Sequence, residues 1–403
     1  MRNKTIYILL ILLTSFIEGK GQTLSDYTKI AIENNQELQS IQHRIEGKGH
    51  DIESVGLLSD PMISGGYYVN PVSTRVGDMQ AQLTIEQALP WMGTLKAEKG
   101  VAQGKKQVEE RYYEFQKRKV ILSTKQLYYR IKRKQIDKKI YQEQLGIYNK
   151  QEEWLAQRVA NGQASNVDLL RLRIKIEAKE AKVEETADES MAFQASFNQL
   201  LNRNAEETIH VTDQWTELEQ YLQDVQAHPS IEIIDSKDQV YQASEKMVRK
   251  KQNPQFKVGA SYTFIEPYAG STLSNNGEDA LMIKVGISLP FFSNKKGKAQ
   301  IRSIRSNQSS LVAEKESKEK DLKAAWIGTN KQLQTTHRNI KLFKKQIDLT
   351  NQSLELLRSE YLTGKEKYIE LLRMEESLLK YKEELSKSQE KAHLLTAMLE
   401  FLK

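Results

Sequence analysis

The sequence contains no cysteine, and this excludes several kinds of site at once. There can be no disulfide framework, no thiolate ligand for a metal and no lipid-acceptor cysteine near the N-terminus. Proline and glycine are also scarce, with 7 and 20 in 403 residues, so few positions interrupt a regular element. A chain that is 28% charged and poor in such breakers is typical of long helices with narrow apolar seams.

Long hydrophobic runs are missing after the first residues of the chain. The segment "MRNKTIYILLILLTSFIEGKGQ" starts with Arg2 and Lys4, continues with an apolar stretch from Ile6 to Ile17 and ends in small residues. This pattern predicts a secretory signal peptide over residues 1–21. No later run approaches the roughly 18 apolar residues of a spanning helix. We therefore expect an exported protein, whose contact with a membrane, if any, is made by strands.

Residue patterns for catalysis, metal binding or nucleic-acid binding are also missing from the sequence. The six histidines are scattered, and neither a G-x-S-x-G motif nor a correctly spaced P-loop occurs. The formal charge of +7 is spread along the chain, with lysine and glutamate interleaved as in "EKESKEKDLK" (314–323). Such mixing is typical of solvated helix faces. The sequence predicts no enzyme, no cofactor, no metal site and no nucleic-acid partner.

The chain contains an internal tandem repeat of about 200 residues. "RVANGQASNVDLLRLR" (158–173) aligns with "EYLTGKEKYIELLRME" (360–375), which places Gly162 opposite Gly364. Pro90 and Pro290 correspond in the same way. The predicted divisions, listed in order, are a signal peptide (1–21), a first repeat (22–202), a connector (203–228) and a second repeat (229–403).

Each half is predicted to contain the same parts in the same order. A helix (24–56 or 229–252) comes first, and a hairpin of two strands follows, with turns at "NPVSTRVGD" (70–78) and "EPYAGSTLSNNGE" (266–278). The strands alternate apolar and polar residues, which indicates one apolar and one polar face. The apolar positions are Ile63, Tyr67, Val69, Met79, Ala81, Leu83, Ile85, Leu89, Phe256, Val258, Ala260, Tyr262, Phe264, Leu281, Ile283, Val285, Ile287 and Leu289. Strands of about nine to eleven residues match the length of a tilted membrane-spanning strand.

After each hairpin the sequence predicts a long unbroken helix, over about 94–160 and 295–361. Apolar residues then recur every seven positions, which indicates coiled-coil packing. The repeating positions are Trp326, Leu333, Ile340, Ile347, Leu354 and Tyr361, then Leu371, Leu378, Leu385, Ala392 and Leu399, and in the first half Leu169, Ile176, Val183 and Phe197. Gly162 and Gly364 stand where each helix is expected to reverse.

Four strands cannot close a barrel, and an open sheet edge cannot face lipid. The predicted fold is therefore an α+β membrane protein in which three copies pool their strands into a 12-stranded β-barrel above a long α-helical coiled-coil barrel. Pro90 and Pro290 would mark the junctions where a strand ends and a helix of the barrel begins.

The ordered set of segments resembles the TolC family of outer-membrane efflux proteins. The resemblance covers residues 24–402 and rests on "LSDYTKIAIENNQEL" (24–38), "SDPMISGGY" (59–67), "QALPWMG" (87–93) and the paired glycine turns. It implies a homotrimer in the outer membrane of a Gram-negative bacterium, extending into the periplasm and contacting outer-membrane lipid. It also implies two protein partners, a periplasmic adaptor and an inner-membrane pump of the RND type.

The resemblance further implies a gate at the periplasmic helix turns. Carried over by position, the gate candidates are Asp168, Tyr361 and Glu370. Two positions depart from the family pattern, since Glu366 stands where a basic residue is expected and Arg373 where an acid is expected. The closing links are therefore expected to involve Arg171 or Arg373. Solvated charges at helix ends are the alternative explanation for each of these residues, and Tyr361 also fits the heptad seam.

The function implied by the resemblance is an outer-membrane channel of a tripartite efflux system that passes metal cations or drugs. The short connector and the "LPWMG" junction favour members that serve metal-cation pumps. Two alternatives stay open from the sequence. One is a type I protein secretion channel, and the other is a secreted coiled-coil structural protein, although the latter does not account for four amphipathic strands.

Overall fold

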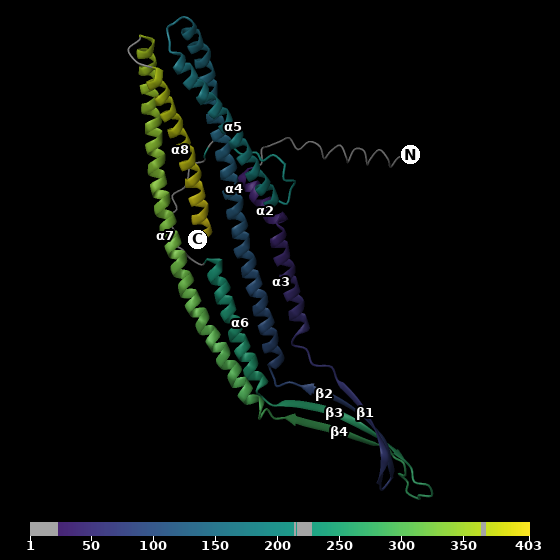
Figure 1. Cartoon of the computed structure of the whole chain (residues 1–403). Helices are drawn as coiled ribbons and strands as arrows, with labels where there is room; N and C mark the ends of the chain where they lie inside the picture. Colours follow the sequence, from purple (N-terminus) through teal and green to yellow (C-terminus); the bar gives the residue numbers. More distant parts are fainter. Residues whose placement is uncertain (1–22, 213–214, 216–227, 364–367) are drawn as a thin grey trace, which may run out of the picture. The chain divides into compact units, whose positions relative to one another are not determined.

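A computed structural model describes residues 23–212, 215, 228–363 and 368–403 (Figure 1). The predicted signal peptide and Gly364 lie outside these residues. The elements, in chain order, are α2 (Leu24–Asn34), α3 (Gln36–Ser54), β1 (Met62–Thr74), β2 (Gly77–Leu89), α4 (Thr94–Ala160), α5 (Asn166–Leu200), α6 (Pro229–Lys251), β3 (Gln255–Glu266), β4 (Ala280–Ser288), α7 (Ser293–Leu362) and α8 (Tyr368–Leu402). None of the helices in the described ranges is both long and apolar enough to cross a membrane.

The chain forms two compact units, and each draws on both halves of the sequence. The sheet unit comprises Ser40–Glu114 and Pro229–Glu319. The helical unit comprises the described residues up to Gln39, together with Phe115–His228 and Lys320–Lys403. The boundaries of the two sequence repeats are a different division and stay a prediction.

The helix predicted over 24–56 is wrong at one position, because it is broken at Asn35. Asn35 ends α2 with extended backbone angles (φ −68°, ψ 117°). Its side-chain oxygen then accepts a hydrogen bond from the Leu38 N–H at 3.0 Å, so the same residue caps α3. At the other end of α2, Thr23 and Asp26 form a reciprocal capping box, which fixes where the helix starts.

The two long helices are confirmed almost to the residue. The structure has α4 at Thr94–Ala160 and α7 at Ser293–Leu362. The heptad positions of α7 are also confirmed as a packing seam. Ile347, Leu354 and Tyr361 belong to one apolar cluster with α8, and Trp326, Leu333 and Ile340 belong to a second. Because the seven-residue period keeps these side chains on one stripe, the helices bury a narrow face and leave the charged remainder in water.

The four strands form one antiparallel sheet in the order β1-β2-β3-β4. The central pair joins the two halves of the sequence, with Leu83 opposite Tyr262. The first predicted turn is too long: β1 continues to Thr74 and β2 starts at Gly77. The Thr74 hydroxyl closes this tight turn by donating to the Gly77 carbonyl at 2.7 Å. Pro71 is tolerated because it falls in the register gap between Tyr67 and Val72 on an edge strand.

Candidate functional site

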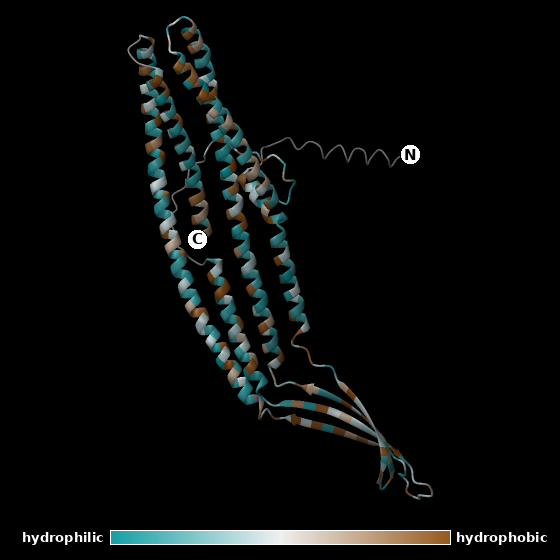
Figure 2. Ribbon diagram, viewed as in Figure 1, coloured by the Kyte–Doolittle hydropathy of each residue, from teal (hydrophilic) through white to brown (hydrophobic). Residues whose placement is uncertain are grey.

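The two faces of the sheet are reversed relative to those of a soluble protein. The predicted apolar face is exposed: Ile283 retains 79% of its accessible surface and Val285 76%. On the opposite, polar face the hydroxyl side chains of the two central strands are buried: Ser261 is 1%, Thr263 3% and Thr84 7% exposed. Figure 2 shows the result as alternating hydrophobic and hydrophilic bands along the strands. A sheet that buries hydroxyl groups and exposes aliphatic side chains suits an apolar surrounding on its outer face.

The polar face is held together by side-chain hydrogen bonds that cross between strands. Gln82 of β2 donates to the Thr263 hydroxyl of β3 at 3.2 Å. The Lys284 ammonium of β4 lies 3.5 Å from the Thr84 hydroxyl of β2. These contacts satisfy part of the hydrogen-bonding capacity of the polar face without water. They also bring residues from both sequence repeats to one surface.

Among the described residues, the outer strands of the sheet have no partner on their far sides. Each of β2 and β3 pairs on both sides, whereas β1 pairs only with β2 and β4 only with β3. An unpaired edge exposes a row of N–H and C=O groups that another strand can complete. The sheet is therefore an open segment rather than a finished structure.

The structure places the two prolines in the segments that join strand to helix. Pro90 lies between β2 and α4, and Pro290 lies between β4 and α7. After Pro90, Gly93 has φ +83°, a conformation that glycine adopts without strain. Trp91 stacks on Phe256 of β3 with ring centroids 6.0 Å apart, so this junction is packed against the sheet.

At the far end of α4 the chain reverses through a Schellman motif. The Gln163 N–H donates to the Arg158 carbonyl at 2.8 Å, and the Gly162 N–H donates to the Val159 carbonyl at 3.0 Å. Gly162 has φ +71°. Ser165 then caps α5 by accepting from the Val167 N–H at 3.2 Å. The equivalent turn at Gly364 lies outside the described residues.

Around this reversal, the ends of four helices share one apolar cluster. It contains side chains from α4, α5, α7 and α8, among them Leu155, Leu172, Leu354 and Leu372. Tyr361 lies at its margin, where its ring packs edge-on against Trp154 at 5.6 Å. Partial burial in this cluster raises the pKa of the Tyr361 hydroxyl.

The predicted gate acids do not bond to Tyr361 in the described chain. Instead, each carboxylate pairs with an arginine one turn further along its own helix. Asp168 lies 3.3 Å from Arg171, and Glu370 lies 2.7 Å from Arg373. Both acids stand in the first turn of their helices, where the macrodipole favours negative charge. The structure therefore brings the four charged candidates together as two separate pairs.

A buried acid near these helix ends was missed at the sequence level. Glu375 is 2% exposed and accepts hydrogen bonds from Gln151 at 2.7 Å and Arg358 at 3.2 Å. Gln151 in turn accepts from the Tyr368 hydroxyl at 2.9 Å. Burial raises the pKa of the Glu375 carboxyl. The sequence does hold one indication of this burial, because Glu375 lies on the apolar heptad stripe between Leu371 and Leu378.

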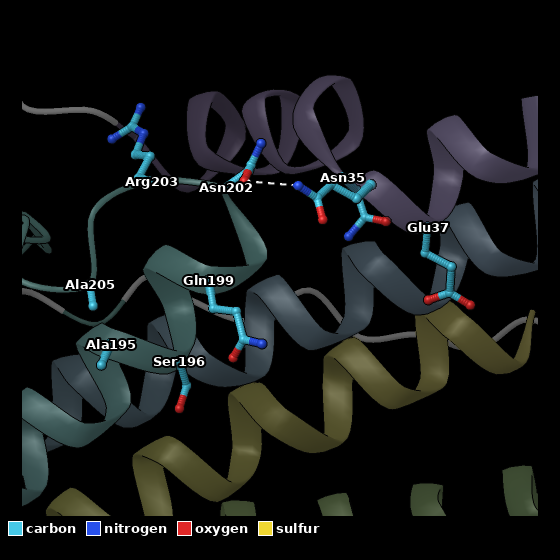
Figure 3. A pocket seen from close by; sticks show the side chains of 9 residues that line it. Asn35, Glu37, Ala195, Ser196, Gln199, Asn202, Arg203 and Ala205 are labelled. Atoms are coloured by element: carbon cyan, nitrogen blue, oxygen red, sulfur yellow. Dashed lines mark hydrogen bonds between the residues drawn. The ribbon is translucent and has the colours of Figure 1, made fainter.

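A second feature of the helical unit is a polar depression of about 580 Å³ at the α2–α3 break and the end of α5 (Figure 3). Gln36 donates to Asn202 across it at 3.5 Å, and Glu37 and Arg203 contribute its charged groups. Asn202 has φ +54°, a conformation that asparagine tolerates. The lining residues include no nucleophile beside a base and no pair of acids. Within the described residues, no three histidine or acidic side chains form a group that could hold a metal ion.

The sequence matches the family model described as "Outer membrane efflux protein" over residues 28–203 and 226–400. The chain belongs to the outer membrane efflux protein family. No curated protein matches it. Proteins of this family are channels, and the chain is an outer-membrane channel protein of efflux systems with a TolC-like fold.

Solved structures of outer-membrane channels share the fold of this family member. VceC of Vibrio cholerae is 18% identical with a TM-score of 0.75, and the match covers 94% of this chain and 95% of VceC. CmeC of Campylobacter jejuni is 13% identical with a TM-score of 0.72, over 96% of this chain and 90% of CmeC. The open state of MtrE of Neisseria gonorrhoeae is 15% identical with a TM-score of 0.71, over 94% and 88%.

Proposed function

We propose that three copies of this chain form one channel, in which their sheets join edge to edge into a 12-stranded barrel. The observation that carries the proposal is the four-stranded sheet, which combines an exposed apolar face with two unpaired edges. In lipid each unpaired backbone group costs several kcal/mol, because no water replaces the missing partner. Pairing β1 of one copy with β4 of the next removes both edges and turns the polar face inward.

In this assembly the heptad-packed helices extend the channel from the outer membrane of a Gram-negative bacterium into the periplasm. A periplasmic adaptor and an inner-membrane pump of the RND type would complete the efflux system. The short connector (203–228) and the "LPWMG" junction support metal cations as the cargo rather than drugs or polypeptides. In this proposal the channel passes its cargo and carries out no chemistry on it.

We assign the gate to the helix ends that carry Asp168 and Glu370. Four helix ends meet there on one apolar cluster, so small movements of any helix displace both acids together. Each acid already forms an ion pair with an arginine. Opening or closing of the gate would therefore replace these ion pairs with others. Tyr361, which packs on Trp154, supports this region through packing rather than through a bond to Asp168.

The test of the trimer is disulfide cross-linking, for which the cysteine-free chain is a clean background. Ser64→Cys in β1 is combined in turn with a cysteine at each inward position of β4, namely Ala280, Met282, Lys284, Gly286 and Ser288. At least one combination should give covalent dimers and trimers on oxidation in outer membranes. The matched control joins Ser64→Cys with Ser261→Cys, because the central strand β3 is out of reach of a neighbouring copy.

Two outcomes of this experiment are decisive. A cross-linked ladder that ends at three protomers supports the barrel. A water-soluble monomer or dimer that gives no product at any β4 position would refute it, and the secreted coiled-coil alternative would then account for the protein. Type I protein secretion uses the same oligomer, so it is distinguished by the partner protein that co-purifies.

A further inference from the structure

The boundary between sheet and helices in the sheet unit carries an unusual excess of positive charge. No aspartate or glutamate occurs in the sequence between Asp279 and Glu314. Within that interval, three lysines stand together at the start of α7: Lys295, Lys296 and Lys298. All three are exposed. The stretch includes the end of the sheet and the first five turns or so of the helix.

Helix stability does not explain these lysines. The N-terminus of a helix carries the positive end of its dipole, so cations there are unfavourable and acids are favoured. The first turn of α7 contains no acid. The end of α6 adds to the charge with Arg249, Lys250 and Lys251. These two helix ends lie against each other, since the Gln252 side chain donates to the Asn294 carbonyl at 3.5 Å.

Two acids of the helices at this boundary are already paired. Glu98 lies 2.7 Å from Lys251. Glu245 lies 2.6 Å from Arg249 and 3.0 Å from Arg305. Over the part of the chain that the structure describes, four lysines at the end of α6 and the start of α7 have no carboxylate within ion-pair distance: Lys250, Lys295, Lys296 and Lys298. We call these four side chains the lysine collar.

Exposed apolar side chains lie directly next to the lysine collar along the chain. Phe292 is 96% exposed, Phe291 75% and Leu289 50%. At the corresponding junction after β2, Met92 is 87% exposed. Aromatic side chains beside lysines, at the end of a sheet with an apolar outer face, are typical of the membrane–water interface. Within the described chain, no contact accounts for the exposure of these apolar side chains or of the lysine collar.

We propose that the lysine collar binds the headgroups of anionic phospholipids in the periplasmic leaflet, while Phe291 and Phe292 contact their acyl chains. The charges are complementary, since a phosphodiester presents acceptor oxygens to several ammonium groups at once. The proposal rests on the placement of the sheet in the outer membrane. It adds a lipid class and a residue set that the channel function alone does not require.

The experiment measures phospholipid binding to the full-length protein in detergent by native mass spectrometry. Phosphatidylglycerol and phosphatidylcholine are the two probes. The wild-type protein should retain phosphatidylglycerol more tightly. Since each lysine near an anionic lipid surface contributes about a fivefold gain in affinity, the triple variant Lys295→Gln/Lys296→Gln/Lys298→Gln should lose on the order of 100-fold for phosphatidylglycerol. Its affinity for phosphatidylcholine should not change.

Two further variants make the result specific. Lys341→Gln/Lys344→Gln/Lys345→Gln removes three exposed lysines of the same helix and should leave both affinities unchanged. Phe291→Ser/Phe292→Ser should weaken both lipids alike, because it removes acyl-chain contact and no charge. The lysine replacements relieve an unfavourable dipole interaction, so they should not unfold α7.

Three results would overturn the proposal. In the first, wild-type protein binds both lipids equally. In the second, the triple lysine variant keeps its phosphatidylglycerol affinity but changes the ion selectivity of the channel, so the lysines line the lumen. In the third, the phenylalanine variant binds normally and inorganic phosphate or an acidic protein competes, so the occupant is a soluble anion. Each leaves the cross-linked trimer intact, whereas failure of the channel assignment abolishes the trimer itself.

Discussion

The buried acid Glu375 allows a quantitative prediction about the ends of α7 and α8. Replacing it with alanine removes one buried methylene group, worth about 0.8 kcal/mol, together with the carboxyl group. It also removes the hydrogen bonds from Gln151 and Arg358, and the second of these, which involves the charged guanidinium, contributes roughly 1.5 kcal/mol or more. The sum of about 2.3 kcal/mol corresponds to an increase of roughly 50-fold in local opening.

The loss of stability caused by Glu375→Ala should depend on pH, and the burial of the carboxyl group determines the direction of that dependence. Burial raises the pKa of this carboxyl, so the folded protein holds the proton more tightly than the unfolded chain does. The contribution of Glu375 to stability is therefore full below its ordinary pKa and decreases as the pH rises through the raised value. The loss in the alanine variant should be larger at mildly acidic than at neutral pH.

Amide hydrogen exchange of the segments 352–363 and 368–378, followed by mass spectrometry, measures this opening directly. Glu376→Ala is the matched control. Glu376 follows Glu375 in the sequence, but its side chain is 39% exposed and pairs with Lys175 at the surface. Exposed pairs contribute about 0–1 kcal/mol, so exchange should increase fivefold or less, roughly. The reasoning is wrong if both variants accelerate exchange equally, or if the effect of Glu375→Ala grows as the pH rises.

Three further predictions concern other described residues. Gly162→Ala should destabilise the α4–α5 turn by about 1 kcal/mol because of its positive φ, whereas Gly328→Ala inside α7 should stabilise by about the same amount, as measured by thermal unfolding. In planar bilayers, Glu370→Gln should shift ion selectivity toward anions by leaving Arg373 unpaired, and Arg373→Gln should shift it toward cations; no change in either would remove the gate assignment. Burial lowers the pKa of His393 to about 4, so its contribution to stability is lost as the pH falls from about 6.5 toward 4. His393→Phe should abolish that part of the acid destabilisation in a pH-dependent denaturation series.

The parts of the fold that repeat at a fixed period could be predicted from the sequence. Alternation by two defined the strands, and a period of seven defined the seam from Trp326 to Tyr361, because each pattern is set by the local backbone geometry. The break at Asn35 could not be predicted in the same way. An asparagine within a helical sequence pattern does not by itself indicate a break. Its capping role is recognised only from the structure, in which the Leu38 N–H donates to its side chain.

The candidate gate was predictable as a place but not as a set of contacts. The glycine turns located it, and Gly162 has the expected positive φ. Which side chains pair there depends on rotamers and on four helices that are distant in the sequence. Thus Asp168 pairs with Arg171 rather than with Tyr361, and the link from Arg358 to Glu375 had no local signature. Tertiary packing decides such contacts, and periodicity does not report them.

The pairing of β2 with β3 determines when the sheet can form. Leu83 of β2 pairs with Tyr262 of β3. The first hairpin therefore cannot become part of the complete sheet until well over a hundred further residues have been synthesised and exported. The helical hairpins depend mainly on local contacts and can form earlier. During that interval the apolar strand faces and free edges are exposed together, which makes the incomplete chain prone to aggregation. We therefore expect biogenesis to require a periplasmic holding chaperone until the last strand arrives.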